Sequence, residues 1–395
     1  MSQQAKLHSD VLIVGGGTAS LFLSRYLLNH PRQPTVQVIE RAASDQRRAQ
    51  GVLVHPITQS LIEDLLPDHS WGWSGTVQRL REFHGQTLLY ELDAGTTGKD
   101  AQRRYPSNEQ LGDIDRVLLK DIGGHPRGQI RYQAEVTSID LTEDVWHVDL
   151  ATPEGPQQHT SSVLVAADGR ESTLRDWLGV PYERVDFPGK VDVLAFPDRR
   201  DDVPAISMVL GAGGATTVVD NGVGPNTLIF DMRADRTQPQ TPSALRDEAV
   251  DRAATAGLSI SNPAGPLFTT SFRSATVACG TWLARRALVF GDAAHAMHNL
   301  GGQGFNLTVQ DAVALAPGII DLIDGDDSRL RAYETFRLPY ITEVQRRQNK
   351  LFDAFADDRP DDVGEGWFQP LHRSLVDGQD GLDFFLDGAV EQRDA

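Results

Sequence analysis

Apolar residues near the start of the chain form two continuous runs that flank a segment of helical spacing. Residues 11–14 are apolar at every position, which is typical of a strand buried on both faces. Residues 18–29 carry apolar side chains at helical spacing until Pro31 ends the pattern. Residues 36–39 form the second apolar run. Because crossover connections join parallel neighbours, this order predicts a βαβ unit with two parallel strands.

The middle of the chain mixes both periods. Residues 51–66 predict a strand edge followed by a helix, and residues 114–122 predict another helix. Further strands are expected at 87–90, 129–132, 145–150 and 163–167.

The pattern changes over residues 188–280. Short apolar runs separated by Gly and Pro are typical of antiparallel sheet, and one helix is expected at about 242–256. Residues 287–290 return to buried-strand character, and helices follow to about residue 355. The acidic, Gly-rich segment 351–395 is expected to form a helical or irregular tail.

Charge and composition narrow the possible function classes. Lys and Arg number 37 against 55 Asp and Glu, and the net charge of −18 repels phosphate backbones. Basic residues cluster only in short pairs such as Arg103-Arg104, so nucleic-acid binding is not expected. No stretch approaches the roughly 18 apolar residues of a membrane helix, and no secretory signal pattern is present. We therefore expect a cytoplasmic globular protein without a transmembrane segment.

Length and cysteine content add two further bounds. At 395 residues the chain exceeds the size of one hydrophobic core, so two domains are expected. The single cysteine, Cys279, lies in an apolar stretch and cannot form an internal disulfide. A buried thiol of this kind usually behaves as a small hydrophobe.

The first candidate site is the glycine triplet at 15–17, where the first strand turns into the first helix. Glycine lets the backbone approach a pyrophosphate, and the helix N-terminus favours its negative charge. Ser20 takes the third position of the G-x-G-x-x-G pattern. Glu40 ends the second strand, where a carboxylate can bind a ribose diol and would repel a 2′-phosphate. Together these features predict a dinucleotide site that disfavours NADP, rather than a glycine-rich turn without a ligand.

A second candidate segment, residues 168–175, directly follows the apolar run at 163–167. By itself it could be a turn in which Ser172 caps a helix and Glu171 favours the helix dipole.

A third candidate segment, residues 291–306, also follows a predicted buried strand. Asp292 stands at the strand end, where it can bind a sugar-like hydroxyl. The glycine-rich stretch 301–304 opens a helix whose N-terminus could face an anion. Two glycine-rich strand ends, one near each end of the chain, indicate one long cofactor that spans both.

Taken together, the three segments resemble the fingerprints of the class A flavoprotein monooxygenases, the para-hydroxybenzoate-hydroxylase-like family of FAD-dependent aromatic hydroxylases. Residues 15–40 resemble the ADP-binding unit, 168–175 the "DG" motif and 291–306 the "GD" motif. The resemblance spans about residues 8–345. Residues 298–307 are most similar to the ubiquinone-biosynthesis ring hydroxylases and related antibiotic-pathway enzymes.

The resemblance implies a bound FAD and a transiently bound NAD(P)H. It places two groups of residues around the FAD. Those at the adenosine and pyrophosphate are Gly15, Gly17, Thr18, Ala19, Glu40, Arg41 and Val136. Those at the ribityl chain and flavin are Arg48, Asp292, Gly302, Gly304, Phe305 and Asn306, with Asp168 of the second motif as a further contact.

The same resemblance names two candidate catalytic residues. His298, as a neutral imidazole near pH 7, could exchange a proton with the substrate or the flavin hydroperoxide. Asn299 stands where the family often has proline, at the border of the substrate. For His298, and for His295 and His55, a hydrogen-bonded structural imidazole is the alternative. No His, Asp and Glu set has metal-ligand spacing, so no metal site is expected.

Two departures from the family pattern carry consequences. Pro317-Gly318 falls in a helix that the family usually keeps continuous, so a kink or break is expected there. Halogenases of the same fold carry a Trp-x-Trp-x-Ile-Pro signature, and the sequence after Trp71-Gly-Trp73 does not match it.

The expected fold is α/β, with a Rossmann-like FAD-binding domain and an inserted antiparallel-sheet substrate domain. The FAD-binding domain would comprise 1–72, 101–187 and 281–350, and the substrate domain 73–100 and 188–280. The resemblance implies a monomer or homodimer that hydroxylates a small aromatic or quinone-like molecule with dioxygen through a C4a-hydroperoxyflavin. The alternatives are a same-fold flavin reductase or oxidase, or a halogenase, while a non-catalytic escort would have lost the cofactor motifs.

Overall fold

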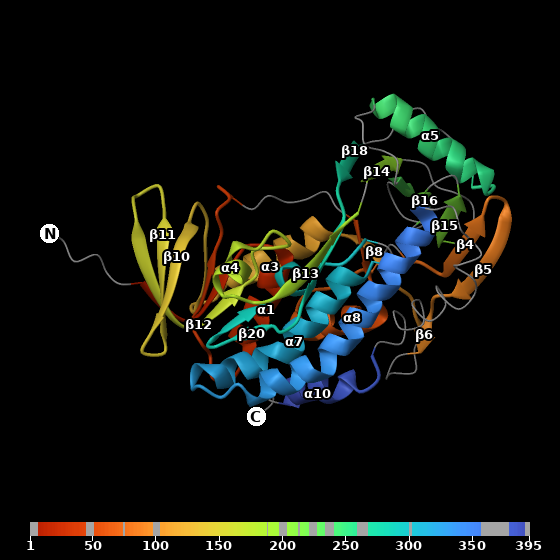
Figure 1. Ribbon diagram of the computed structural model, residues 1–395. Helices are drawn as coiled ribbons and strands as arrows, with labels where there is room; N and C mark the ends of the chain where they lie inside the picture. Colours follow the sequence, from red (N-terminus) through yellow and green to blue (C-terminus); the bar gives the residue numbers. More distant parts are fainter. Residues whose placement is uncertain are drawn as a thin grey trace.

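The computed structural model places two sheets beside each other, each with its own hydrophobic core (Figure 1). We call the eight-stranded one the first sheet and the seven-stranded one the second sheet. The structure describes residues 7–44, 51–73, 76–97, 103–187, 189–196, 204–211, 214–220, 227–233, 241–258, 268–299, 302–356 and 379–391.

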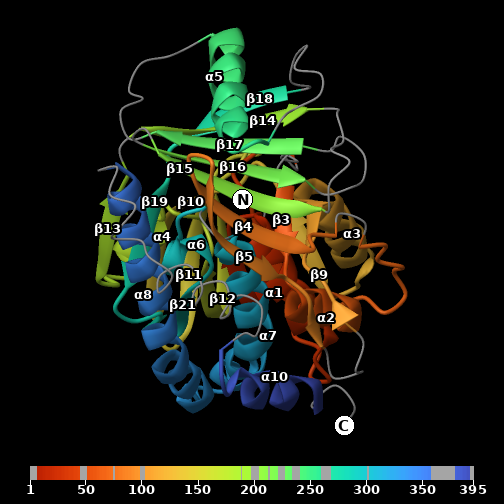
Figure 2. The ribbon, with the colours of Figure 1, turned by 90° about the vertical axis from the view of Figure 1, so that its right-hand side faces the viewer.

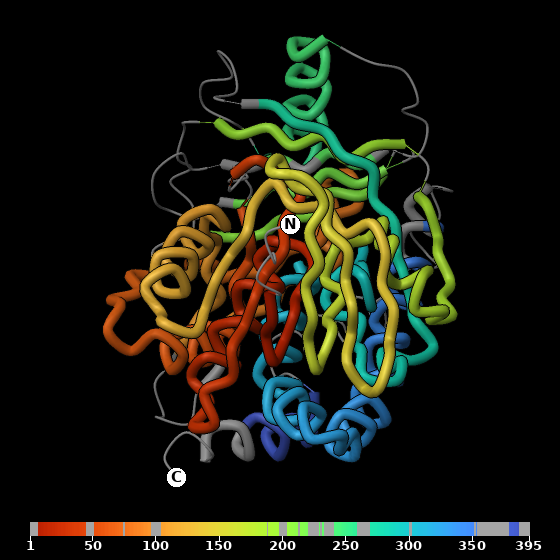
Figure 3. Tube along the Cα trace, turned by 90° about the vertical axis from the view of Figure 1, so that its left-hand side faces the viewer, coloured from red at the N-terminus to blue at the C-terminus, as the bar shows by residue number. Residues whose placement is uncertain are grey.

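The first sheet is parallel at its centre and antiparallel at one edge. Five parallel strands run in the order β21, β12, β1, β2 and β9. Their bounds are β21 (Ala287–Val289), β12 (Gln157–Ala166), β1 (Leu7–Val14), β2 (Val36–Ile39) and β9 (Gly128–Arg131). The first half of β12 also pairs antiparallel with β11 (Val145–Ala151), and β11 with β10 (Glu135–Thr142). Figure 3 shows these two strands in front, at the end of the molecule away from the second sheet. The short β20 (Leu283–Ala284) completes the sheet beside β21.

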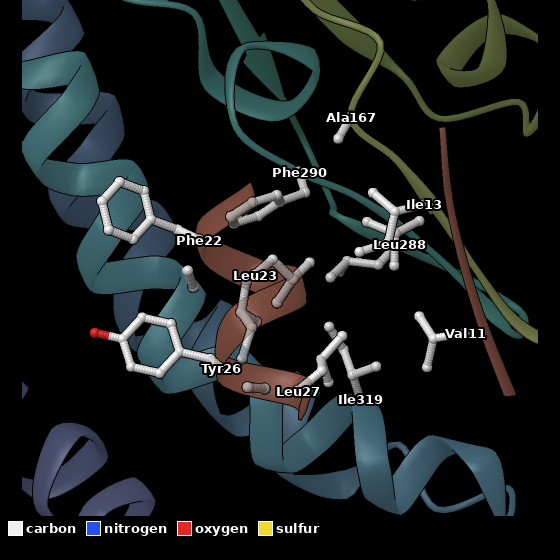
Figure 4. Close-up of a cluster of buried hydrophobic side chains, with 14 of the residues drawn as sticks. Val11, Ile13, Phe22, Leu23, Tyr26, Leu27, Ala167, Leu288, Phe290 and Ile319 are labelled. Atoms are coloured by element: carbon white, nitrogen blue, oxygen red, sulfur yellow. The ribbon is translucent and has the colours of Figure 1, made fainter. Parts of the chain in front are cut away.

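Helix α1 (Thr18–Asn29) packs between the first sheet and α7 (Gln303–Ile323). Figure 4 shows Phe22 and Tyr26 on the side of α1 near the neighbouring helix and Ile13 and Leu288 across from it on the strands. All four side chains are buried, which explains why the apolar positions of residues 18–29 cover most of the helix surface.

Helix α7 is the core helix of this half of the molecule. It is the one described helix long and apolar enough to span a membrane, and 89% of that stretch is buried inside the protein. Its neighbours are α1, α2 (Pro56–Leu65), α8 (Ser328–Ala356) and α10 (Leu382–Glu391).

Of the kink or break expected at Pro317, the break is wrong, because α7 continues through that residue to Ile323. Gly318 has a packing role instead: a Cβ there would lie 2.7 Å from the Leu330 side chain on α8. Gly318 therefore permits a close approach of α7 and α8, and Pro317-Gly318 does not interrupt α7.

The second sheet runs in the order β18, β14, β17, β16, β15, β4 and β5. Figure 2 shows it with α5 (Pro242–Thr255) on its outer side and the first sheet on the other. Helix α5 confirms the helix expected at about 242–256, and Thr241 caps it through a hydrogen bond from the Ala244 N–H. The bounds are β18 (Phe268–Phe272), β14 (Lys190–Phe196), β17 (Thr227–Arg233), β16 (Gly214–Asp220), β15 (Ala205–Gly211), β4 (Arg79–His84) and β5 (Thr87–Asp93).

Shorter elements connect the two halves. Helix α3 (Leu111–Gly124) packs on α1, and three two-stranded sheets lie along the connections. These sheets pair β3 (Gly51–Val54) with β8 (Ser107–Gln110), β6 (Thr96–Thr97) with β7 (Arg103–Arg104), and β13 (Tyr182–Asp186) with β19 (Ala275–Cys279). Helices α4 (Thr173–Trp177) and α6 (Asp292–His295) belong to the second and third sequence motifs. Cys279 is buried at the end of β19, and burial raises the pKa of its thiol to about 12, so it packs as a small hydrophobe.

Candidate cofactor site

The three sequence motifs meet at one edge of the first sheet. Val14 is paired with Ile39 and Ala166, and Ala166 with Val289, so these four strands end at the same level. Backbone hydrogen bonds extend the pairing one residue further, from Gly15 N–H to the Ile39 carbonyl at 2.8 Å. The residues that follow these strands therefore lie side by side along the carboxyl edge, where ligands of parallel sheets bind.

Gly15 and Gly16 shape the turn after β1. Gly15 has φ +107°, and a Cβ there would lie 2.2 Å from the Ala167 carbonyl oxygen. A Cβ on Gly16 would lie 2.9 Å from the Glu40 side chain. Both positions therefore require glycine for the packing of the chain itself.

Gly17 is different, because a Cβ there would meet nothing within 4 Å. It is the N-cap of α1 and makes no side-chain cap hydrogen bond. The Thr18 hydroxyl is directed elsewhere, since it donates to Asp115 on α3 at 2.7 Å. The positive end of the α1 dipole thus faces open space, as a pyrophosphate site requires.

Glu40 lies between the glycine turn and β10. Its carboxylate accepts hydrogen bonds from the N–H groups of Gly16, at 2.6 Å, and Ala42, at 2.7 Å. Its backbone carbonyl accepts from the Ala134 N–H, which brings Val136 at the start of β10 to the same edge. Arg41, next to Glu40, is exposed. The acid, Arg41 and Val136 are thus together at the end expected for adenosine.

Asp168 at the end of β12 caps α4. Its carboxylate accepts from the N–H groups of Thr173 and Leu174 and from the Ser172 hydroxyl. Ser172 in turn accepts from the Arg175 N–H. The turn-and-cap interpretation therefore describes the local geometry of this motif, and a direct contact of Asp168 with FAD stays a prediction.

Arg175 joins the second motif to the third. Its side chain is 2% exposed, and its guanidinium donates to the carbonyl oxygens of Arg170 and Ala293 and stacks over the Tyr182 ring, with 3.8 Å to the centroid. The sequence analysis did not identify Arg175 as a functional residue. Its position within the helix of the second motif is the one sequence feature that could have identified it.

Asp292 opens α6 and is exposed at the strand edge. The preceding Gly291 has φ +61°, and a Cβ there would lie 2.9 Å from that of Ala19 on α1. This close approach brings Asp292 beside the start of α1, so the first and third motifs form one surface.

Helix α6 is anchored by a buried polar network. His295 Nε2 lies 2.8 Å from the Asp311 carboxylate on α7, which also accepts from Tyr333 and Arg337 of α8. Burial alone would raise the pKa of Asp311, but the Arg337 charge and these hydrogen bonds hold it below its usual value. His295 therefore has a structural partner, as the structural alternative for this residue predicts.

The glycine-rich stretch of the third motif opens α7. Gly302 is left-handed with φ +62°, and α7 has no side-chain cap. A Cβ on Gly304 would meet nothing within 4 Å. Asn306 is buried and donates to the Leu53 and Gly302 carbonyls while accepting from the His55 N–H. Its amide fixes β3 against the start of α7, and its neighbour Phe305 packs edge-on against Phe22.

His298 and Asn299 lie on the loop between α6 and α7. His298 is buried against the edge of Phe187, and burial lowers its imidazole pKa to about 3. The Asn299 amide lies 3.7 Å from the sulfur of Met232 in the second sheet. This loop therefore stands between the two halves of the molecule.

Two α8 glutamines that sequence reasoning missed hold this loop. Gln345 donates to the carbonyls of Val277 and Ala296, and Gln348 donates to that of His298. Their spacing of three residues on one helix face is the only signal that the sequence offers.

Two further sequence candidates have different outcomes. His55 is buried at the start of α2, and burial lowers its pKa to about 4. Arg48 lies outside the described residues.

The residues present fit FAD on three independent observations. Helices α1 and α7 begin at glycine N-caps, the cradle at Gly17 and Gly304 leaves room for a ligand, and the exposed Asp292 stands beside the start of α1. Anion-binding helix ends with a carboxylate between them match a cofactor with a central pyrophosphate and hydroxyl groups.

Relatives of known sequence are monooxygenases. The protoasukamycin 4-monooxygenase of Streptomyces nodosus subsp. asukaensis is 26% identical over 371 residues, which cover 87% of this chain and 88% of the relative. The ubiquinone hydroxylase UbiL of Rhodospirillum rubrum is 26% identical over 364 residues, which cover 89% of this chain and 82% of the relative.

Solved structures share the fold. The p-nitrophenol 4-monooxygenase PnpA from Pseudomonas putida has a TM-score of 0.75 at 17% identity and covers 99% of both chains. PqsL from Pseudomonas aeruginosa, described as a probable FAD-dependent monooxygenase, has a TM-score of 0.72 at 22% identity and covers 92% of this chain and 100% of its own.

The profile of the FAD binding domain family matches residues 8–348, which include all three motifs and both sheets. The chain therefore belongs to the FAD-binding-domain family, the family of the FAD-dependent aromatic monooxygenases that its motifs resemble.

Proposed function

We propose that this FAD-dependent oxidoreductase uses NAD(P)H and dioxygen to hydroxylate a small aromatic molecule. The observation that carries the proposal is the convergence of the three motifs at one level of the first sheet. Relatives whose names identify them as acting on protoasukamycin, 6-methylpretetramide and anhydrotetracycline support an aromatic polyketide as the substrate class. NAD(P)H would bind transiently, since only one dinucleotide motif occurs in the sequence.

FAD, when bound, supplies reduction by NAD(P)H and activation of dioxygen. The chain contributes binding and orientation. The α1 N-terminus at Gly17 would hold the pyrophosphate, Glu40 the adenosine ribose and Asp292 the ribityl chain. The α7 N-terminus at Gly302 and Gly304 would stabilise negative charge on the flavin ring.

The substrate would bind between the 298–299 loop and the second sheet. Apolar side chains on the face of that sheet opposite α5, such as Met208 and Met232, would exclude water. Neutral His298 and Asn299 would position the ring by hydrogen bonds. We also propose the domain division that the sequence predicts, with 73–100 and 188–280 as the substrate domain and 1–72, 101–187 and 281–350 as the FAD domain. The proposed active unit is a monomer or homodimer.

The test is product analysis under ¹⁸O₂. The purified protein, loaded with FAD, is incubated with NAD(P)H and a panel of aromatic polyketides and quinone precursors, and products are analysed by mass spectrometry. A product that carries one ¹⁸O atom, formed only with NAD(P)H, is the expected result. NAD(P)H consumption that depends on a panel member without incorporation of ¹⁸O would instead identify a flavin reductase or oxidase.

A further inference from the structure

The second sheet has two faces with different neighbours. Val209, Val218 and Ile229 share one hydrophobic cluster with Leu245 and Ala249 of α5, and Phe83 of β4 packs against it. Because side chains alternate along a strand, the residues next to these point to the opposite face. We call that opposite face the inner face.

The inner face is directed at the FAD-binding half of the molecule. Leu80 of β4 and Ile206 of β15, which are register partners, pack with Leu53 of β3. Leu53 belongs to the strand that Asn306 fixes against the start of α7. On β17, Met232 of the inner face contacts Asn299.

Glu82 of β4 belongs to the inner face. It lies two residues after Leu80 and directly before Phe83, and its register partners are Met208 on β15 and Tyr90 on β5. The β4–β5 register shifts at this point, but the extra residue is in β5, so the alternation of β4 is kept.

One oxygen of the buried Glu82 carboxyl has no hydrogen-bond donor among the described residues. The residue is 3% exposed, and its Oε1 is inaccessible and has no partner in the part of the chain that the structure describes. The two arginines that precede it on β4, Arg79 and Arg81, pair with Asp93 and Glu91 instead. A buried acid without a partner is costly, so its presence calls for an explanation.

Other buried acids of the same sheet have donors. Asp231, on the α5 face, accepts from the Thr216 hydroxyl at 2.7 Å and lies 3.5 Å from the Arg252 guanidinium. Asp192 accepts from the Ser271 hydroxyl. Glu82 therefore lacks the donors that these two acids have. It also lies on the inner face, where the substrate would bind.

We propose that Glu82 accepts a hydrogen bond from a hydroxyl or amino substituent of the aromatic substrate and so selects rings that carry such a donor. The inference rests on the proposed function, whose substrate class it narrows to uncharged phenols and aromatic amines. A carboxylate on the ring would repel the Glu82 carboxylate. A methyl ether has no hydrogen-bond donor and would leave the carboxylate unsatisfied.

The protonation equilibrium of Glu82 suits this role. Burial raises its pKa to about 7, so the carboxyl can accept a hydrogen bond as an anion and can retain a proton received from an acidic phenol.

The test compares ligand binding to FAD-loaded protein. The probes are phenol, 1-naphthol and 1,8-dihydroxyanthraquinone, each with its O-methyl ether, and binding is followed by the change in flavin absorbance. The wild type should bind at least one hydroxylated probe about tenfold or more tightly than its ether, as expected for a hydrogen bond to a buried charged group. Glu82→Leu should abolish that preference, whereas Glu82→Gln, which keeps an acceptor oxygen, should retain part of it.

The matched control is Glu91→Leu, which removes an exposed acid of the neighbouring strand and should keep the full preference. Glu82→Leu should also unfold at the same or a higher temperature than the wild type, because it loses a buried charge and no hydrogen bond. Equal affinity for hydroxylated and methylated probes in the wild type, absence of binding included, or a preference that survives in Glu82→Leu, overturns the proposal. Oxygen incorporation by the wild type is measured separately, so failure of this inference is distinguishable from failure of the proposed function.

Discussion

The lowered pKa of His298 favours the structural one of its two sequence interpretations. An imidazole with a pKa of about 3 is neutral near pH 7 and is too weak a base to take up a proton from the substrate there. Its contact with Phe187 and the hydrogen bond from Gln348 to its carbonyl fit a positioning role.

We therefore expect His298→Asn and His298→Gln to retain most of the coupling between NAD(P)H oxidation and product formation. His298→Ala should lose coupling and release more hydrogen peroxide, because the loop no longer presents the ring correctly. The measurement is product formed per NAD(P)H consumed, with FAD content as the control for folding. A loss of about 100-fold in all three variants would restore the acid–base role.

Asp292 should matter for the cofactor and little for the fold. It is exposed, and a hydrogen bond to a charged group contributes roughly 1–3 kcal/mol, so Asp292→Ala should weaken FAD binding tens-fold. Asp321→Ala removes a half-buried acid of α7 that pairs with Arg329 and should leave FAD affinity unchanged. Fluorescence titration of the apoprotein with FAD measures both, and equal affinity in the wild type and Asp292→Ala would contradict the assigned role.

At the scale of elements, two glycines of the β1–α1 turn have different roles: Gly15 is needed for packing and Gly17 for ligand binding. Gly15→Ala should destabilise the protein by on the order of 2 kcal/mol or more, because φ is positive and the Ala167 carbonyl occupies the space. Gly17→Ala meets no neighbour within 4 Å and should keep the stability of the apoprotein while it weakens FAD binding. Urea unfolding of the apoprotein measures stability, and FAD titration measures cofactor affinity. Equal destabilisation by both substitutions would contradict the different roles of the two glycines.

The elements with a strong period were predictable from the sequence, and those fixed by tertiary contacts were not. The βαβ unit follows from its apolar runs and spacing, and the helix expected at 242–256 is confirmed as α5. Strand β13 is exposed along its whole length, so it has no apolar pattern to detect. Pro317 does not break α7, because burial on all sides stabilises a helix that local propensity disfavours.

The candidate site was predictable where a residue type marks a strand end, as at Gly15, Glu40 and Asp292. The partners that hold these residues come from distant parts of the chain. Arg175 and Gln345 act on backbone carbonyls, which leave no signature in the sequence. The unsatisfied Glu82 is visible only once the sheet register is known.

On the scale of the whole molecule, buried histidines should make the protein sensitive to mild acid. Burial lowers the pKa of His55 and His159 to about 4 and that of His298 to about 3. Each contributes stability that is present above the unfolded pKa of about 6.5 and is lost as the pH falls towards the folded value. Glu82, with its pKa raised to about 7, acts in the opposite direction. The combined effect of the three histidines on the free energy of unfolding is larger than that of Glu82.

The free energy of unfolding should therefore fall between pH 6.5 and pH 5 by on the order of 2 kcal/mol per pH unit. Urea unfolding at fixed FAD concentration measures the slope. His159 is hydrogen-bonded to Ser9, far from the strand-end motifs. His159→Gln should therefore reduce the slope of the unfolding free energy with pH. A stability that is constant over this range would contradict the account of the three imidazoles.

The convergence of three motifs on one FAD is tested most directly by the cofactor that the purified protein releases. The chain is loaded with an equimolar mixture of FAD and FMN, freed of unbound flavin and denatured, and the released flavin is identified by chromatography. An α1 N-terminus that holds a pyrophosphate and an Asp292 that holds a ribityl chain require both halves of FAD, so about one FAD per chain and no FMN is expected. A colourless protein that retains no flavin, or one that retains FMN equally well, would contradict the account.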